Sequence, residues 1–92
     1  MKERMYKAIQ MLTRDHANVF LAIFTAPCEL KASPEQIREE TKHFSSGEQI
    51  VRDMALSIWS GEEKVSIYEY VNTVDSTLKQ TLVDALIYLM RY

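Results

Sequence analysis

Residues that interrupt regular backbone are scarce and widely spaced in this 92-residue sequence. It contains two prolines, Pro27 and Pro34, and two glycines, Gly47 and Gly61. Proline and glycine mark most tight turns, so a chain with so few of them favours a few helices over many short strands. We therefore predict an all-α fold, a small compact bundle of four to five helices that forms a single helical domain over residues 1–92.

The composition is that of a globular protein, with 47% hydrophobic and 26% charged residues. The net charge of −2 is unfavourable for a surface that tracks nucleic-acid phosphates. The single Cys28 cannot form an intramolecular disulfide, which favours a reducing compartment. The longest apolar run, Val19 to Cys28, is shorter than the ~20 residues of a membrane span. The first ten residues lack the apolar stretch of a signal peptide. We expect a cytoplasmic protein without membrane contact.

Apolar residues at spacings of three and four predict a first helix from about Lys2 to Thr25, ended by Pro27. This stripe consists of Met5, Ile9, Leu12, His16, Val19 and Ile23. The helix either runs unbroken or breaks where Thr13 or Asp15 offers a cap. His16 is expected to be a hydrogen-bonded residue in the core or at its boundary.

Cap signals predict the next two helices. Ser33 would cap a helix from Pro34 to about Lys42, with Gln36 completing a capping box. The following helix would begin after Ser45 or Ser46 and end at Gly61.

The stretch from Val65 to Gln80 reads as a short helix, a turn and the start of the last helix. Ser66 and Glu69 have capping-box spacing, and Val65 is placed to contact Tyr70. Either Asp75 or Ser76 would cap the last helix.

The last helix is apolar over more of its circumference than one core contact requires. Its main face is formed by Leu78, Leu82, Ala85, Leu86 and Leu89. Val83, Ile87 and Met90 widen the apolar arc to roughly 200°. Such a helix is either central in the bundle or shared with a partner, and both alternatives remain open.

No group of residues predicts catalysis, a cofactor or a metal. Cys28, His16 and His43 occur at unrelated positions, and no glycine-rich phosphate loop is present. Glu40 and His43 have the spacing of half a di-iron site, but the other ligands of such a site are missing. We expect a non-enzymatic protein.

Two classes of binding function remain. The leading hypothesis is a protein-interaction module, with a homodimer among the candidates, that uses Leu56, Trp59, Val83, Ile87 and Met90 as its interface. The alternative is a helix-turn-helix DNA-binding regulator over Ser33–Trp59, with Arg52 as the basic residue of the reading helix. Acidic residues around Arg52 make nucleic acid the less favoured partner.

Four segments carry a resemblance to known sequences: RDHANVFLAIF (Arg14 to Phe24), IVRDMALSIWSG (Ile50 to Gly61), SIYEYVNTVD and the ending ALIYLMRY. Together they resemble an uncharacterised family of short phage and prophage proteins. The segment from Glu29 to Phe44 departs from that pattern. The resemblance implies a mobile-element origin and a small interaction protein, with inhibition of a host protein as the candidate role.

Overall fold

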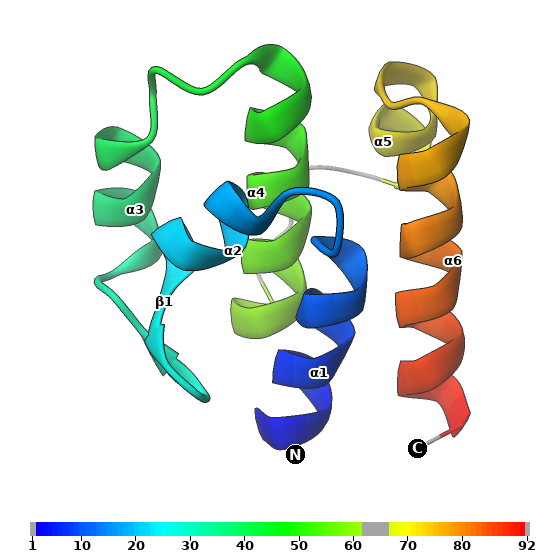
Figure 1. The fold of residues 1–92 in the computed structure, drawn as a ribbon, viewed down its shortest axis with the longest axis horizontal. Helices are drawn as coiled ribbons and strands as arrows, with labels where there is room; N and C mark the ends of the chain where they lie inside the picture. Colours follow the sequence, from blue (N-terminus) through cyan, green and yellow to red (C-terminus); the bar gives the residue numbers. More distant parts are fainter. Residues whose placement is uncertain (1, 62–66, 92) are drawn as a thin grey trace.

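A computed structural model describes residues 2–61 and 67–91 and confirms the all-α class (Figure 1). Six helices and one two-stranded hairpin follow one another within these residues. They are α1 (Lys2–Leu12), α2 (Ala17–Ile23), β1 (Phe24–Ala26), β2 (Glu29–Leu30), α3 (Pro34–Glu40), α4 (Ser46–Ser60), α5 (Ile67–Thr73) and α6 (Ser76–Arg91). The number of helices exceeds the predicted four to five because the first predicted helix is divided.

The break falls near Thr13, as one of the two alternatives allowed. The Thr13 hydroxyl donates to the carbonyl of Ile9 at 2.8 Å, and α2 starts again at Ala17. The expected cap is wrong, however, because His16 occupies the N-cap position of α2 and makes no side-chain capping bond. The chain changes direction here, so α1 and α2 pack as separate helices.

The hairpin was not predicted. The helix ends at Ile23 rather than Thr25, and Phe24 pairs with Leu30 while Ala26 pairs with Glu29. Proline disfavours helical backbone in the residue before it, which accounts for the extended Ala26 ahead of Pro27. Cys28 completes the turn with a positive φ of 60°.

The helix caps follow the sequence signals. The Ser33 hydroxyl accepts from the backbone N–H of Gln36 at 3.2 Å, while the Gln36 side chain donates to Glu40 instead of closing a box. Ser45, not Ser46, caps α4 and forms a full capping box with Glu48. Gly61 ends α4 in the left-handed region at φ 77°.

Asp75 caps α6, since its carboxylate accepts from the backbone N–H of Leu78 at 2.9 Å. The predicted box of Ser66 with Glu69 and the contact of Val65 with Tyr70 lie outside the described residues. Tyr70 itself is fully buried.

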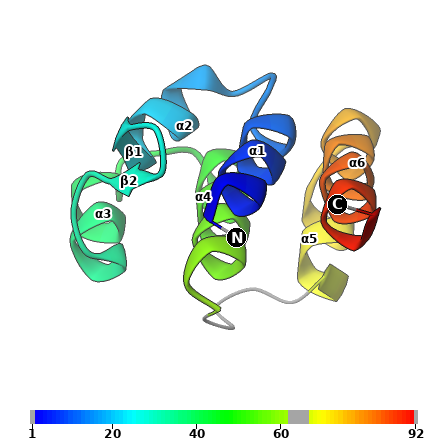
Figure 2. The ribbon, with the colours of Figure 1, turned by 90° about the horizontal axis from the view of Figure 1, so that it is seen from below.

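Helix α4 is the centre of the molecule. It contacts α1 and α2 on one side and α5 on the other, and Figure 2 shows α3 and α6 at opposite edges. Four rings from four elements, α4 included, form one cluster in which Tyr6, Phe20 and Trp59 each pack tilted or edge-on near Phe24. This arrangement leaves α6 covered on one side only, mainly by α1.

Candidate interaction surface

The outer face of α6 exposes an apolar stripe. Val83 is 45% exposed, Ile87 39% and Met90 78%. Their spacing of four and three residues places them on one side of the helix. The opposite side is formed by the buried Leu78, Thr81, Leu82 and Ala85. No described element covers the outer stripe, so α6 is an edge helix and not the centre of the bundle.

The sequence alone could not decide whether α6 is central in the bundle or shared with a partner. The widened apolar arc was compatible with central packing, but α4 takes the central position instead. The apolar residues of α6 that do not face the core are therefore exposed in the described part of the chain. Such a patch is a usual mark of a protein interface.

A shallow groove borders the stripe on the side of α1. It encloses about 210 Å³ and is lined by Met11 from α1 and by Asp84, Ile87, Tyr88 and Arg91 from α6. Asp84 accepts from Arg14 at 3.3 Å and from Gln80 at 2.9 Å. The groove thus combines apolar lining residues with one acidic and one basic residue.

Leu56 and Trp59 do not lie on this surface, which corrects their prediction as interface residues. Leu56 is fully buried and Trp59 is 8% exposed. Leu56 points away from the main stripe of α4, but α4 is packed on more than one side, so that direction is also covered. The ring of Trp59 packs edge-on against Phe24 with centroids 5.0 Å apart.

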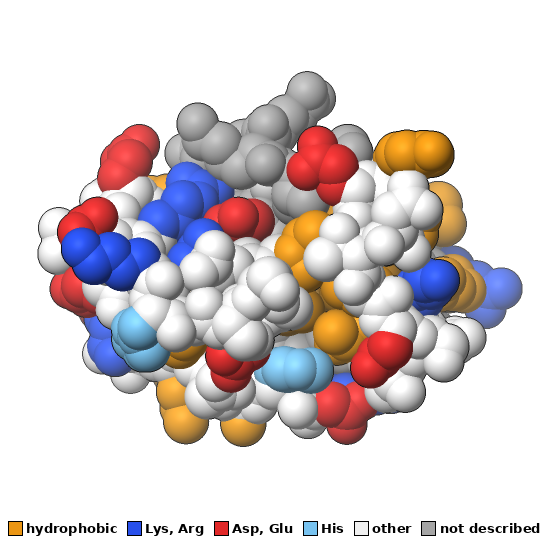
Figure 3. Space-filling view, turned by 90° about the horizontal axis from the view of Figure 1, so that it is seen from above, with side chains coloured by type: hydrophobic (Ala, Val, Ile, Leu, Met, Phe, Trp, Pro, Cys, Tyr) orange, Lys and Arg blue, Asp and Glu red, His pale blue; other side chains and the backbone are white. Residues whose placement is uncertain are grey.

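Arg52 is also buried, at 6% exposed, which removes the basic residue of the helix-turn-helix hypothesis. Its guanidinium donates to Thr41 at the end of α3 and pairs with Asp53 at 3.0 Å. Acidic and basic side chains are intermixed on the face seen in Figure 3. No observation therefore favours a phosphate-binding surface within the described residues.

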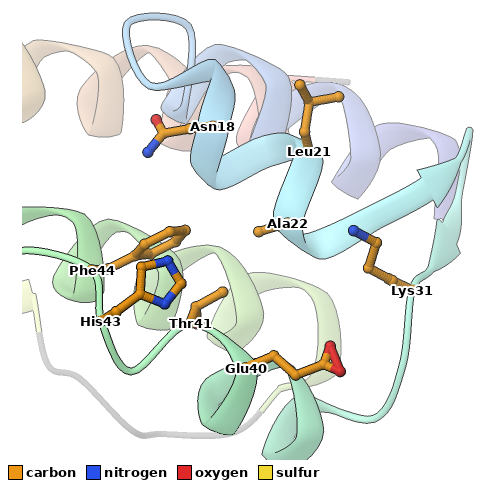
Figure 4. Close-up of a pocket in the computed structure, with 8 residues that line it drawn as sticks. All are labelled: Asn18, Leu21, Ala22, Lys31, Glu40, Thr41, His43 and Phe44. Atoms are coloured by element: carbon orange, nitrogen blue, oxygen red, sulfur yellow. The ribbon is translucent and has the colours of Figure 1, made fainter.

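A second hollow lies between α2 and the end of α3 (Figure 4). It encloses about 500 Å³ and includes Glu40 and His43 among its lining residues. Figure 4 shows the Glu40 carboxylate pointing away from the His43 imidazole, which instead packs edge-on against Phe44 at 5.1 Å. No group of three or more metal-binding side chains occurs in residues 2–61 and 67–91.

Leu21 lines this hollow and is 65% exposed, but it was not predicted as a surface residue from the sequence. Its position two residues from both Val19 and Ile23 places it opposite the buried stripe, so helical periodicity contained the signal. Met11 was also missed, and the sequence held no signal for its place beside α6, because that place depends on the pairing of α1 with α6.

His16 is half-buried, as expected for a residue at the boundary of the core. Its hydrogen bonding differs from the expectation. Its Nδ1 atom is buried and has no hydrogen-bond partner among the described residues. The nearby Glu48 accepts from the Ser45 backbone N–H and from the Asn18 amide. These bonds hold the pKa of Glu48 below its usual value, and His16 adds a small electrostatic contribution.

Comparisons with family models, with curated proteins and with solved structures gave no match for this chain. The resemblance to short phage proteins and the inhibition of a host protein therefore stay predictions. Among the helices of the described residues, none has the length and apolarity needed to cross a membrane.

Proposed function

We propose that this chain is a non-catalytic protein-interaction module of the cytoplasm that binds a protein partner through the outer face of α6. The observation that carries the proposal is the exposed stripe of Val83, Ile87 and Met90 on an edge helix. Exposing this much apolar surface in water is unfavourable, and a partner that covers it gains the free energy of its burial.

The groove beside the stripe supports the same function. It is lined by Ile87 and Tyr88 together with the charged Asp84 and Arg91. An apolar centre with charged groups at the edge is the usual anatomy of a protein interface, in which the rim charges orient the partner.

Photo-crosslinking in cells tests the proposal. A photoreactive amino acid replaces Ile87 in one variant and Glu35, an exposed residue of α3, in the control. We expect the Ile87 variant to give a discrete protein adduct on illumination and the Glu35 variant to give none. Absence of an adduct at Ile87, or equal adducts at both positions, would show that the α6 face is not a binding surface.

A further inference from the structure

We infer that the partner of this face is a second copy of the chain, bound antiparallel through α6 about a two-fold axis. The inference rests on the proposed function and deepens it. It follows from the way two separate features of α6 share one centre.

The first of these centres is the midpoint of the apolar stripe along α6. Val83 and Met90 are its ends, so its midpoint lies between Leu86 and Ile87. In an antiparallel pair related by a two-fold axis, residue i meets residue j and j meets i. An axis at this midpoint places Val83 of each copy against Met90 of the other, with the two Ile87 side chains near the axis.

The charges supply the second centre. Asp84 and Arg91 are seven residues apart, two helical turns, and both line the groove on one flank of the stripe. Their midpoint lies between Ile87 and Tyr88, one residue from the apolar midpoint, which is a shift of about 1.5 Å along the helix. An axis at the apolar midpoint therefore leaves Asp84 about 3 Å along the helix from Arg91 of the other copy, an offset that the long arginine side chain spans.

The same axis brings opposite charges together. A two-fold axis perpendicular to both helices keeps the charged flank of one copy beside the charged flank of the other. Asp84 of each copy then faces Arg91 of the other, which gives two symmetric ion pairs. A parallel arrangement about a two-fold axis along the helices would instead place the two charged flanks on opposite sides of the contact, where Asp84 of one copy does not meet Arg91 of the other.

Both charged groups are available for such pairing. Arg91 is exposed, and no acidic group pairs with it within residues 2–61 and 67–91. Asp84 already accepts one bond on each carboxylate oxygen, from Arg14 and Gln80. Each oxygen has a further lone pair, so the carboxylate can also accept from a second guanidinium.

The contact is short. Val83 to Met90 spans about 10 Å of helix, so the interface is smaller than that of a tight dimer. The dimer therefore depends on concentration, and light scattering on the purified chain is measured from about 5 µM to about 500 µM. We expect the mass to rise from 10.7 kDa towards twice that value.

Charge substitutions test the pairing itself. Asp84→Arg makes the flank wholly basic and Arg91→Asp makes it wholly acidic, so each variant alone is expected to dimerise about tenfold more weakly or worse. An equal mixture of the two variants should regain wild-type association as a heterodimer, since each acidic group then faces a basic one. Glu35→Arg, on α3, controls for the change in net charge of Asp84→Arg, and circular dichroism controls for the fold.

Orientation is tested in a Cys28→Ser background. A mixture of Val83→Cys and Met90→Cys chains should form a disulfide on oxidation, whereas Val83→Cys alone should not. Either a mass of 10.7 kDa throughout the dilution series or a charge-variant mixture no tighter than its components overturns the inference. If the cellular adduct at Ile87 then has another mass, the proposed function stands and only the identity of the partner is wrong. If no adduct forms, both fail.

Discussion

Arg52 of α4 is bonded twice to Thr41 at the end of α3. Its Nη1 atom donates to the Thr41 hydroxyl at 3.0 Å and to the Thr41 carbonyl at 3.3 Å. The same hydroxyl donates to the carbonyl of Ile37 at 2.7 Å. Asp53 adds a second link between the helices, since it pairs with Arg52 at 3.0 Å and with Arg38 at 3.1 Å. The guanidinium of Arg52 thus adds a donor to the Thr41 carbonyl, which also accepts from the backbone N–H of Phe44 at 3.0 Å. Positive charge is favourable at such a helix C-terminus.

Replacing Arg52 by alanine should therefore destabilise the fold. The change removes the donor to the buried Thr41 hydroxyl and one of the two donors to the Thr41 carbonyl, and it removes a largely buried ion pair. We expect this to cost about 2–3 kcal/mol. Urea unfolding followed by circular dichroism measures this loss. Lys79→Ala, an exposed change on α6, should stay within about 0.5 kcal/mol. An unchanged urea midpoint for Arg52→Ala would show that the bonds to Thr41 contribute nothing.

The capping box of α4 gives two neighbouring serines different roles. Ser45 accepts from the Glu48 backbone N–H at 3.2 Å and its own N–H donates to the Glu48 carboxylate at 2.9 Å, whereas Ser46 is the first residue of the helix. We expect Ser45→Ala to lower the free energy of unfolding by about 1 kcal/mol and Ser46→Ala to change it by a few tenths at most. The two variants have identical composition, so their urea midpoints compare position alone. Equal midpoints would contradict the assigned cap.

The cap at Ser33 could be predicted from the sequence because it depends on residues three or four places away. For the same reason the caps of α4 and α6 could each be narrowed to two neighbouring residues, of which the structure uses Ser45 and Asp75. The helix stripes were predictable for the same reason. The surroundings of Leu56 and Ile87 were not, because a stripe shows which way a side chain points and not what lies there. Leu56 is covered because α4 is surrounded by other helices, and Ile87 is exposed because α6 is at the edge.

The hairpin and the groove were also not predicted from the sequence. The hairpin after Ile23 depends on the pairing of Phe24 with Leu30, six residues apart, and the apolar run through it reads equally well as helix. The groove beside Ile87 needs Met11, which is brought there only by the packing of α1 on α6. Both depend on contacts between segments rather than on local spacing.

Tyr70 should make the fold sensitive to base. Burial raises the pKa of Tyr70 to about 12 from 10.0, the nearby negative charge of Asp75 adds to the rise, and a bond with Thr81 opposes it. The folded chain keeps this proton while the unfolded chain releases it near pH 10, so the contribution is complete below pH 10 and is lost as the pH rises towards about 12.

The test compares urea midpoints of wild type and Tyr70→Phe across this pH range. Phenylalanine cannot ionise, so the stability of the variant should fall less steeply above pH 10 than that of the wild type. Tyr68→Phe is the matched control, because Tyr68 is 77% exposed and its neighbour on α5. Parallel pH profiles for wild type and Tyr70→Phe would mean that another group causes the loss.

Trp59 and Ile87 should respond differently to truncation, although both were predicted as interface residues. Trp59 packs on Phe24, and the Lys2 ammonium lies 4.3 Å from the centre of its ring. Trp59→Ala should therefore remove about 3–5 kcal/mol from the free energy of unfolding, as in other buried aromatic truncations. Ile87→Ala should cost less than about 1 kcal/mol at concentrations where the chain is monomeric, because its side chain already contacts water.

Urea unfolding of the two variants at low protein concentration measures both values. A larger loss for Ile87→Ala than for Trp59→Ala would reverse the assignment of core and surface on which the α6 interface depends.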